Sequence, residues 1–187
     1  MDQLRPAVRK VFQRGARRPG VSLAFALAVS IALFASLDAG RSRPAPLRAT
    51  YPSPDAMAQA VLTAVEANDI ERLRALAVTE QEFRSHVWPE LPASRPERNV
   101  PFDFVWEMLQ RNSESHLRQT LSKFQSQPLT LVRMEFSGET TDYDGVTVRR
   151  DTRLVVKDGA GNERIVRLFG STIEQRGRYK VFSYVVD

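Results

Sequence analysis

The hydrophobic pattern of the chain changes at Pro128, and this change constrains the fold more than any other feature of the sequence. Before it, apolar residues recur at helical spacing; after it, they alternate with polar residues as they do in β-strands. Helices followed by a run of antiparallel strands make an α+β layout, in which one face of the sheet packs on the helices. The sequence therefore predicts N-terminal helices packed on a curved antiparallel sheet of four or more strands.

Four helices are predicted, and most carry a clear start signal. Ser53 is a good N-cap for the first helix, and Asp69 for a short second one. Thr79 and Glu82 have the spacing of a capping box, which predicts the start of a third helix. A longer fourth helix begins around Pro101, with an apolar stripe that runs to about residue 127.

The second half of the chain predicts four strands joined by tight turns. Residues 158–162, with the sequence DGAGN, and residues 175–178 have the composition of hairpin turns. The alternating segments that these turns connect are 129–136, 145–156, 163–169 and 178–186.

The N-terminus carries the signals of membrane insertion. Residues 1–20 hold six basic side chains and one acidic one, and residues 21–37 then run without a charge. Basic residues ahead of an apolar segment keep that end in the cytoplasm. Since arginine outnumbers lysine 23 to 4, as in GC-rich bacteria, we predict a single-pass protein of the bacterial inner membrane. Its N-terminus is cytoplasmic, and its C-terminal domain is periplasmic or extracellular.

Cleavage of the apolar segment as a signal peptide is the alternative. The core of a signal peptide has about 7–15 apolar residues, whereas a membrane span needs about 17–25. The C-terminal end of the segment offers no small-x-small cleavage site, because a cut after Ala39 places Leu37 at position −3 relative to the cut. We therefore favour an uncleaved anchor at 21–37, behind the basic tail.

A spacer and one folded domain are predicted after the anchor. Residues 38–52 are rich in proline, alanine and arginine, which predicts a semi-extended spacer, and residues 53–187 form the domain. The chain has no cysteine, so the domain has no disulfide and depends on its hydrophobic core.

Charge and motif content argue against several classes of function. Beyond residue 20 the chain carries 21 basic and 21 acidic side chains, so its net charge there is zero. A neutral body without a basic stripe is not expected to bind nucleic acid. The two histidines lie thirty residues apart with no cysteine beside them, and no phosphate loop or dinucleotide fingerprint is present. We expect no metal and no cofactor.

The Pro-rich stretch from His86 to Trp106 contains most of the candidate site residues. It holds both tryptophans and four of the eleven prolines, which stop one helix and permit the next to begin. We favour a structural corner, and a pocket mouth or partner-binding edge is the alternative. The candidate ligand- or partner-binding residues are His86, Trp88, Trp106 and, on the long helix, His116.

Two charged groups in the strand region are interpreted as structural. Asp142 and Asp144 stand beside a glycine between two strands, where aspartate is a routine turn residue. Arg149, Arg150 and Arg153 alternate with acidic neighbours, which is typical of the solvated face of a sheet.

The order of elements resembles that of the nuclear transport factor two-like, or cystatin-like, cone fold. The resemblance covers residues 53–187, from the helices that begin at SPDAMAQAV to the sheet that ends in YKVFSYVVD. It implies a curved sheet wrapped over N-terminal helices. The superfamily includes isomerases, dehydratases and many binding or assembly domains, so the resemblance does not fix a function.

Three functions remain open from the sequence. We favour a non-enzymatic, membrane-anchored domain that binds another protein or a small apolar ligand. The first alternative is a hydratase or isomerase with His86 or His116 as its base. The second is an assembly module that forms a homodimer through an exposed apolar face of KVFSYVV, residues 180–186.

Overall fold

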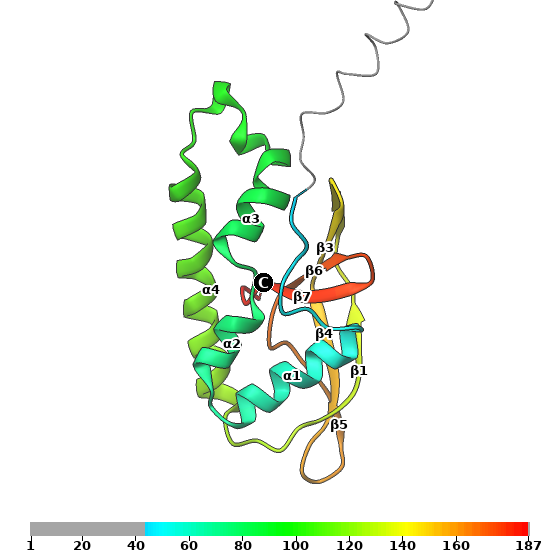
Figure 1. Ribbon diagram of the computed structural model, residues 1–187. Helices are drawn as coiled ribbons and strands as arrows, with labels where there is room; N and C mark the ends of the chain where they lie inside the picture. The colour runs from blue at the N-terminus through cyan, green and yellow to red at the C-terminus, as the bar shows by residue number, and fades with distance from the viewer. Residues whose placement is uncertain (1–43, 187) are drawn as a thin grey trace, which may run out of the picture. The chain divides into compact units, whose positions relative to one another are not determined.

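The computed structural model describes residues 44–186, which form an α+β unit with the helices before the strands (Figure 1). This confirms the predicted fold class. The helices are α1 (Pro54–Glu66), α2 (Ile70–Leu76), α3 (Glu80–His86) and α4 (Phe102–Phe124), with the 3₁₀ turns η1 (Trp88–Glu90), η2 (Pro92–Ser94) and η3 (Pro96–Arg98) between the last two. The strands are β1 (Thr130–Phe136), β2 (Thr140–Tyr143), β3 (Val146–Arg150), β4 (Thr152–Lys157), β5 (Glu163–Val166), β6 (Ser171–Gln175) and β7 (Arg178–Ser183).

The predicted N-caps are all present. The Ser53 hydroxyl accepts a hydrogen bond from the Ala56 N–H at 3.1 Å, and the Asp69 carboxylate accepts one from the Arg72 N–H at 2.9 Å. Thr79 begins α3 with a complete capping box, which satisfies two backbone donors at once. These signals are local, and each lies within one turn of the helix that it starts.

The strands form two antiparallel sheets where one was predicted. The three-stranded sheet has the order β1-β4-β5, and the four-stranded sheet has the order β2-β3-β6-β7. β2 and β6 are strands that the sequence pattern did not predict. Hydrogen bonds from Ser137 to Asp151, and from Thr152 to Gly170, connect the ends of the two sheets. The boundary between the two sheets therefore lies at a bend between β3 and β4, where Asp151 has a φ of +51°.

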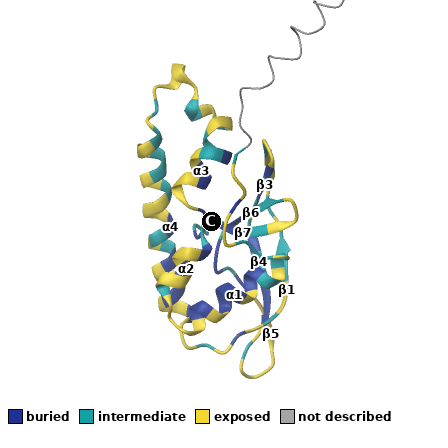
Figure 2. Cartoon of the chain, viewed as in Figure 1, coloured by how far each residue is buried: buried dark blue, intermediate teal, exposed yellow. Residues whose placement is uncertain are grey.

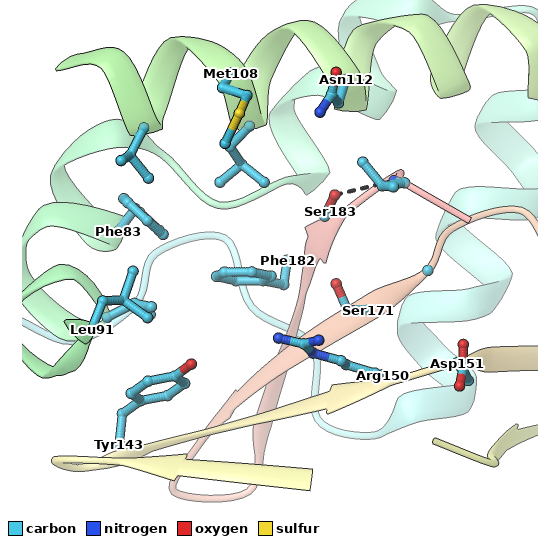
Figure 3. Close-up of a pocket in the computed structure, with 15 residues that line it drawn as sticks. Phe83, Leu91, Met108, Asn112, Tyr143, Arg150, Asp151, Ser171, Phe182 and Ser183 are labelled. Atoms are coloured by element: carbon cyan, nitrogen blue, oxygen red, sulfur yellow. Dashed lines mark hydrogen bonds between the residues drawn. The ribbon is translucent and has the colours of Figure 1, made fainter. Parts of the chain in front are cut away.

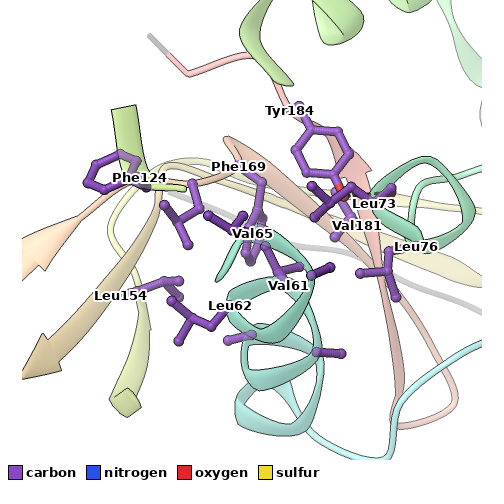
Figure 4. Close-up of a cluster of buried hydrophobic side chains, with 14 of the residues drawn as sticks. Val61, Leu62, Val65, Leu73, Leu76, Phe124, Leu154, Phe169, Val181 and Tyr184 are labelled. Atoms are coloured by element: carbon purple, nitrogen blue, oxygen red, sulfur yellow. Dashed lines mark hydrogen bonds between the residues drawn. The ribbon is translucent and has the colours of Figure 1, made fainter. Parts of the chain in front are cut away.

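The interior consists of two apolar clusters. The larger cluster lies where α1 and α2 pack on the three-stranded sheet and β7, as the dark blue segments of Figure 2 and the side chains of Figure 4 show. The smaller one joins α3, the first half of α4 and the four-stranded sheet through Phe83, Val148 and Ile173. Because both faces of β7 are covered, its KVFSYVV segment exposes no continuous apolar face, and the patch expected for dimerisation is absent from the described residues.

Residues 44–51, which we predicted to be spacer, are part of the folded unit. Leu47 is buried, and its N–H donates to the side chain of Gln175 at 2.8 Å. Tyr51 exchanges backbone hydrogen bonds of 2.8 and 2.9 Å with Tyr179 of β7. The compact unit consequently begins at Pro44 and not at residue 53. A composition rich in proline and arginine concealed these contacts, because they are made mostly by backbone atoms.

One buried ion pair joins this N-terminal segment, α3 and β7. Glu82 of α3 lies 2.9 Å from the Nζ atom of Lys180, and the two side chains are 8% and 1% exposed. The same carboxylate accepts hydrogen bonds from the N–H groups of Arg48 and Thr79, both at 2.8 Å. Burial acts to raise the pKa of Glu82, but the bonds from Thr79, Arg48 and Lys180 outweigh it and leave this pKa below its ordinary value.

None of the helices between residues 44 and 186 is both long and apolar enough to cross a membrane. The predicted cytoplasmic tail at 1–20 and the predicted anchor at 21–37 lie outside the described residues.

We predict that Glu82→Gln destabilises the domain by about 3 kcal/mol, because it leaves the Lys180 ammonium buried without its counter-charge. Glu80→Gln is the matched control on the same helix. Its carboxylate is half exposed and pairs with Arg84 at the surface, so its loss is expected to leave the urea midpoint nearly unchanged.

The decrease in the free energy of unfolding caused by Glu82→Gln is also expected to depend on pH. The folded-state pKa of Glu82 lies below the ordinary 4.5, so its stabilising effect is complete above that pH and disappears as the pH falls through the folded value. Urea unfolding across this range should show the gap between wild type and variant closing in acid. A difference in stability between wild type and Glu82→Gln that does not change with pH would contradict the role of Glu82. An equal loss of stability in Glu82→Gln and Glu80→Gln would contradict it as well.

Candidate functional site

A cavity of about 350 Å³ lies between the helices and the four-stranded sheet. Figure 3 shows its walls: α4 runs along one side, the end of α3 and the turn after it close a second side, and β3, β6 and β7 form the floor. This volume is at the lower end of the range typical of small-molecule sites.

The walls of the cavity are mainly apolar. Phe83 of α3 and Phe182 of β7 face each other with ring centroids 6.1 Å apart. Helical spacing on α4 brings Val105, Met108 and Leu109 to the same side, and Met108 is 47% exposed. The lining is completed by Val87, Leu91, Tyr143, Gly170 and Val185 together with the polar residues Asn112, Arg150, Asp151, Ser171 and Ser183.

Arg150 is exposed, as we predicted, but it also lines this cavity and does not share a face with Arg149. Alternation along β3 places Val146, Val148 and Arg150 on the same face, and the two valines are buried against the helices. Arg149 lies on the opposite face, where it forms an ion pair with Glu174. The sequence analysis assigned both arginines to one solvated face, although alternation along a strand places neighbouring residues on opposite faces.

Tyr143 brings a second polar group to the cavity wall. Burial raises the pKa of its phenol, the positive charge of Arg150 acts to lower it, and Glu139 acts to raise it. The net direction is upward, so the phenol is neutral at physiological pH. Tyr143 can therefore donate a hydrogen bond into the cavity.

Gly170 occupies the point where the sheet bends beneath the C-terminal segment. A Cβ atom at this position would lie only 1.6 Å from the Val185 carbonyl oxygen, so a side chain has no room there. The Gly170 N–H donates to the Ser183 carbonyl at 3.0 Å. This close approach holds Val185 against the cavity.

His86 has a structural role in the described chain. Its ring is 3% exposed, and its Nε2 atom lies 2.8 Å from the Ala45 carbonyl oxygen. Since a carbonyl only accepts, Nε2 carries the proton, and Nδ1 remains a buried acceptor with no partner among residues 44–186. His86 thus helps hold the N-terminal segment and is not among the residues that line the cavity.

The two tryptophans come together in the smaller apolar cluster. Trp88 meets Phe102 edge-to-face at 5.4 Å, and the ring of Trp106 lies 5.6 Å from that of Phe83. Neither lines the cavity, although Phe83 connects Trp106 to its wall. Both side chains are half-buried behind the cavity, where they support the corner between α3 and α4.

His116 is separate from these residues. It lies on α4, and its Nδ1 atom accepts a hydrogen bond of 3.3 Å from the N–H of Val186. Together with the Ser113 hydroxyl, which accepts from the Tyr184 N–H at 3.1 Å, it attaches the C-terminal residues to α4. A ligand-binding role for His86, Trp88, Trp106 and His116 stays a prediction.

The acidic pair near the β2–β3 turn shows no sign of a metal site. Asp142 lies at the end of β2 and accepts a hydrogen bond from the Thr147 hydroxyl at 2.7 Å, and Asp144 lies in the turn. Among residues 44–186, no three histidine, aspartate or glutamate side chains come together as metal ligands would.

Comparison of the chain with protein-family models, curated proteins and solved structures finds no match. The cone-fold resemblance therefore remains a prediction that rests on element order. The site has to be interpreted from its own geometry.

We predict that Gly170→Ala destabilises the domain by about 3 kcal/mol, because the new methyl group collides with a backbone carbonyl that cannot move freely. Gly159→Ala is the comparison, since its Cβ would lie 3.2 Å from a proline ring in an exposed turn. Urea unfolding should give Gly170→Ala a much lower free energy of unfolding than Gly159→Ala. Equal stability of the two variants would show that the backbone at the bend is not packed as described.

Proposed function

We propose that residues 44–186 form a non-catalytic binding domain for a small apolar ligand, which occupies the cavity between α4 and the four-stranded sheet. The observation that carries this proposal is the 350 Å³ space lined by phenylalanine, leucine, valine and methionine side chains. Well-formed apolar cavities with a few polar groups are the usual sites of small-molecule binding.

Access to the cavity is consistent with exchange of a ligand. Met108, Asn112 and Arg150, which lie on the rim, are exposed, whereas Ser171 and Ser183 at the floor are buried. A ligand that enters past Met108 would exchange water contacts for contacts with Phe83 and Phe182. Burial of apolar surface is then the main source of affinity, at about 25 cal/mol per Å².

The histidine-based hydratase or isomerase is less well supported. Both candidate bases hold backbone groups of the terminal segments, and neither lines the cavity. A general base must come within hydrogen-bond reach of the proton that it removes. A substrate in this cavity would meet Tyr143, Arg150 and Asp151 in place of a histidine.

The setting that we propose is the outer side of a bacterial inner membrane. The basic tail at 1–20 and the uncharged segment at 21–37 support an anchor with a cytoplasmic N-terminus. The order of helices and strands supports a cone-like relative of the nuclear transport factor two-like fold. In this setting the domain would capture a ligand close to the membrane surface.

We predict that the full chain binds decan-1-ol and that Val105→Phe weakens this binding at least about tenfold, because the added ring fills the cavity. Tryptophan emission provides the readout, since Trp106 contacts the cavity wall through Phe83. The matched control is Val132→Phe, the same substitution at an exposed position of β1.

Thermal unfolding of each variant checks that the fold is retained. The proposal requires that Val132→Phe bind like the wild type while Val105→Phe does not. Equal binding by all three proteins would place the ligand elsewhere, and absence of binding by the wild type would refute the proposed function for this class of ligand.

A further inference from the structure

Arg150 is the one cation among the described residues that line the cavity. Figure 3 shows its side chain extending over the floor, toward the space between Phe182 and Tyr143. The placement follows from the register of β3, because Arg150 shares its face with the buried Val146 and Val148. A charge in this position lies beside the apolar walls and still reaches water through the rim.

No carboxylate of the described residues neutralises Arg150. Every ion pair within 4.0 Å in this part of the chain involves other basic groups, and Arg149 next to it is already paired with Glu174. The Asp151 carboxylate also lines the cavity, but it forms no ion pair with Arg150. It lies against Gly138, where an added Cβ would be 2.4 Å from its Oδ2 atom. The guanidinium therefore keeps its donors available.

Neutral polar groups close to Arg150 complete a head-group site. Ser171, which is directly across the β3–β6 pairing from Arg150, contributes a hydroxyl to the cavity lining. Tyr143 lies near enough for the charge of Arg150 to act on its phenol, whose pKa is nevertheless raised. Arginine, serine and neutral tyrosine all donate hydrogen bonds, and such a set suits an anionic oxygen acceptor.

The size of the cavity restricts the rest of the ligand. About 350 Å³ is small for a drug-sized site and leaves no room for a lipid with two acyl chains. A single apolar chain would lie between the Phe83–Phe182 pair and the α4 side chains. Its head would then reach Arg150 at the rim.

We infer that the ligand is a small single-chain amphiphile with an anionic head group, which Arg150 binds while the apolar tail fills the cavity. This inference rests on the proposed function, since it specifies the ligand of the same site. Planar carboxylates fit the guanidinium best, because the two groups form paired, parallel hydrogen bonds.

The test compares decanoate with decan-1-ol, which have the same tail and differ in the charge of the head. The wild-type full chain should bind decanoate about tenfold to a hundredfold more tightly than the alcohol. Arg150→Met should remove this preference, because it weakens binding of decanoate far more than binding of the alcohol. Arg149→Met, on the opposite face of the same strand, should leave both affinities unchanged.

Arg150→Lys serves as a second variant, because it keeps the charge and loses the paired geometry. It should retain part of the preference for decanoate. Equal affinities of the wild type for the two probes would overturn the inference, and so would a loss of preference in Arg149→Met as large as that in Arg150→Met. Neither result would contradict the proposed binding of an apolar ligand. Binding of neither probe would refute the proposed function and the inference together.

Discussion

The buried pair of Glu82 and Lys180 is the interaction on which the arrangement of this domain depends. An ion pair with almost no exposure requires that all remaining donors and acceptors around it be satisfied, and here the N–H groups of Thr79 and Arg48 do so. One carboxylate thus caps α3, holds the N-terminal segment and binds β7. Because removal of either charged partner leaves the other buried without its counter-charge, the pair stabilises the observed arrangement of these three parts of the chain.

The cavity follows from that arrangement. Phe83 directly follows Glu82 on α3, and Phe182 stands two residues after Lys180 on β7. The ion pair therefore helps to bring the two rings into contact on one wall of the site, with centroids 6.1 Å apart. The aromatic contacts of Trp106 then support Phe83 from behind. A rigid wall of this kind pre-organises a binding site and lowers the cost of ordering it when a ligand enters.

Local signals in the sequence predicted the helices, their caps and the hairpin turns, because each depends on residues a few positions apart. The same reasoning could not find the second role of Glu82, whose partner lies 98 residues away. It also missed the docking of residues 44–51, which relies on backbone atoms, and the cavity role of Arg150. Alternation along β3 separates Arg149 from Arg150, but only the packing of the helices decides which of them lines the cavity.

The central claim is that an anionic amphiphile lies in the cavity with its tail between the contacting pair Phe83 and Phe182 and the side chains of α4. Intermolecular nuclear Overhauser effects between decanoate and the methyl groups of the full chain test it most directly. The account predicts contacts from the chain protons of decanoate to Val105 and Met108, and none to the exposed Ile165 on β5. Contacts to Ile165 without any to Val105 or Met108 would contradict it.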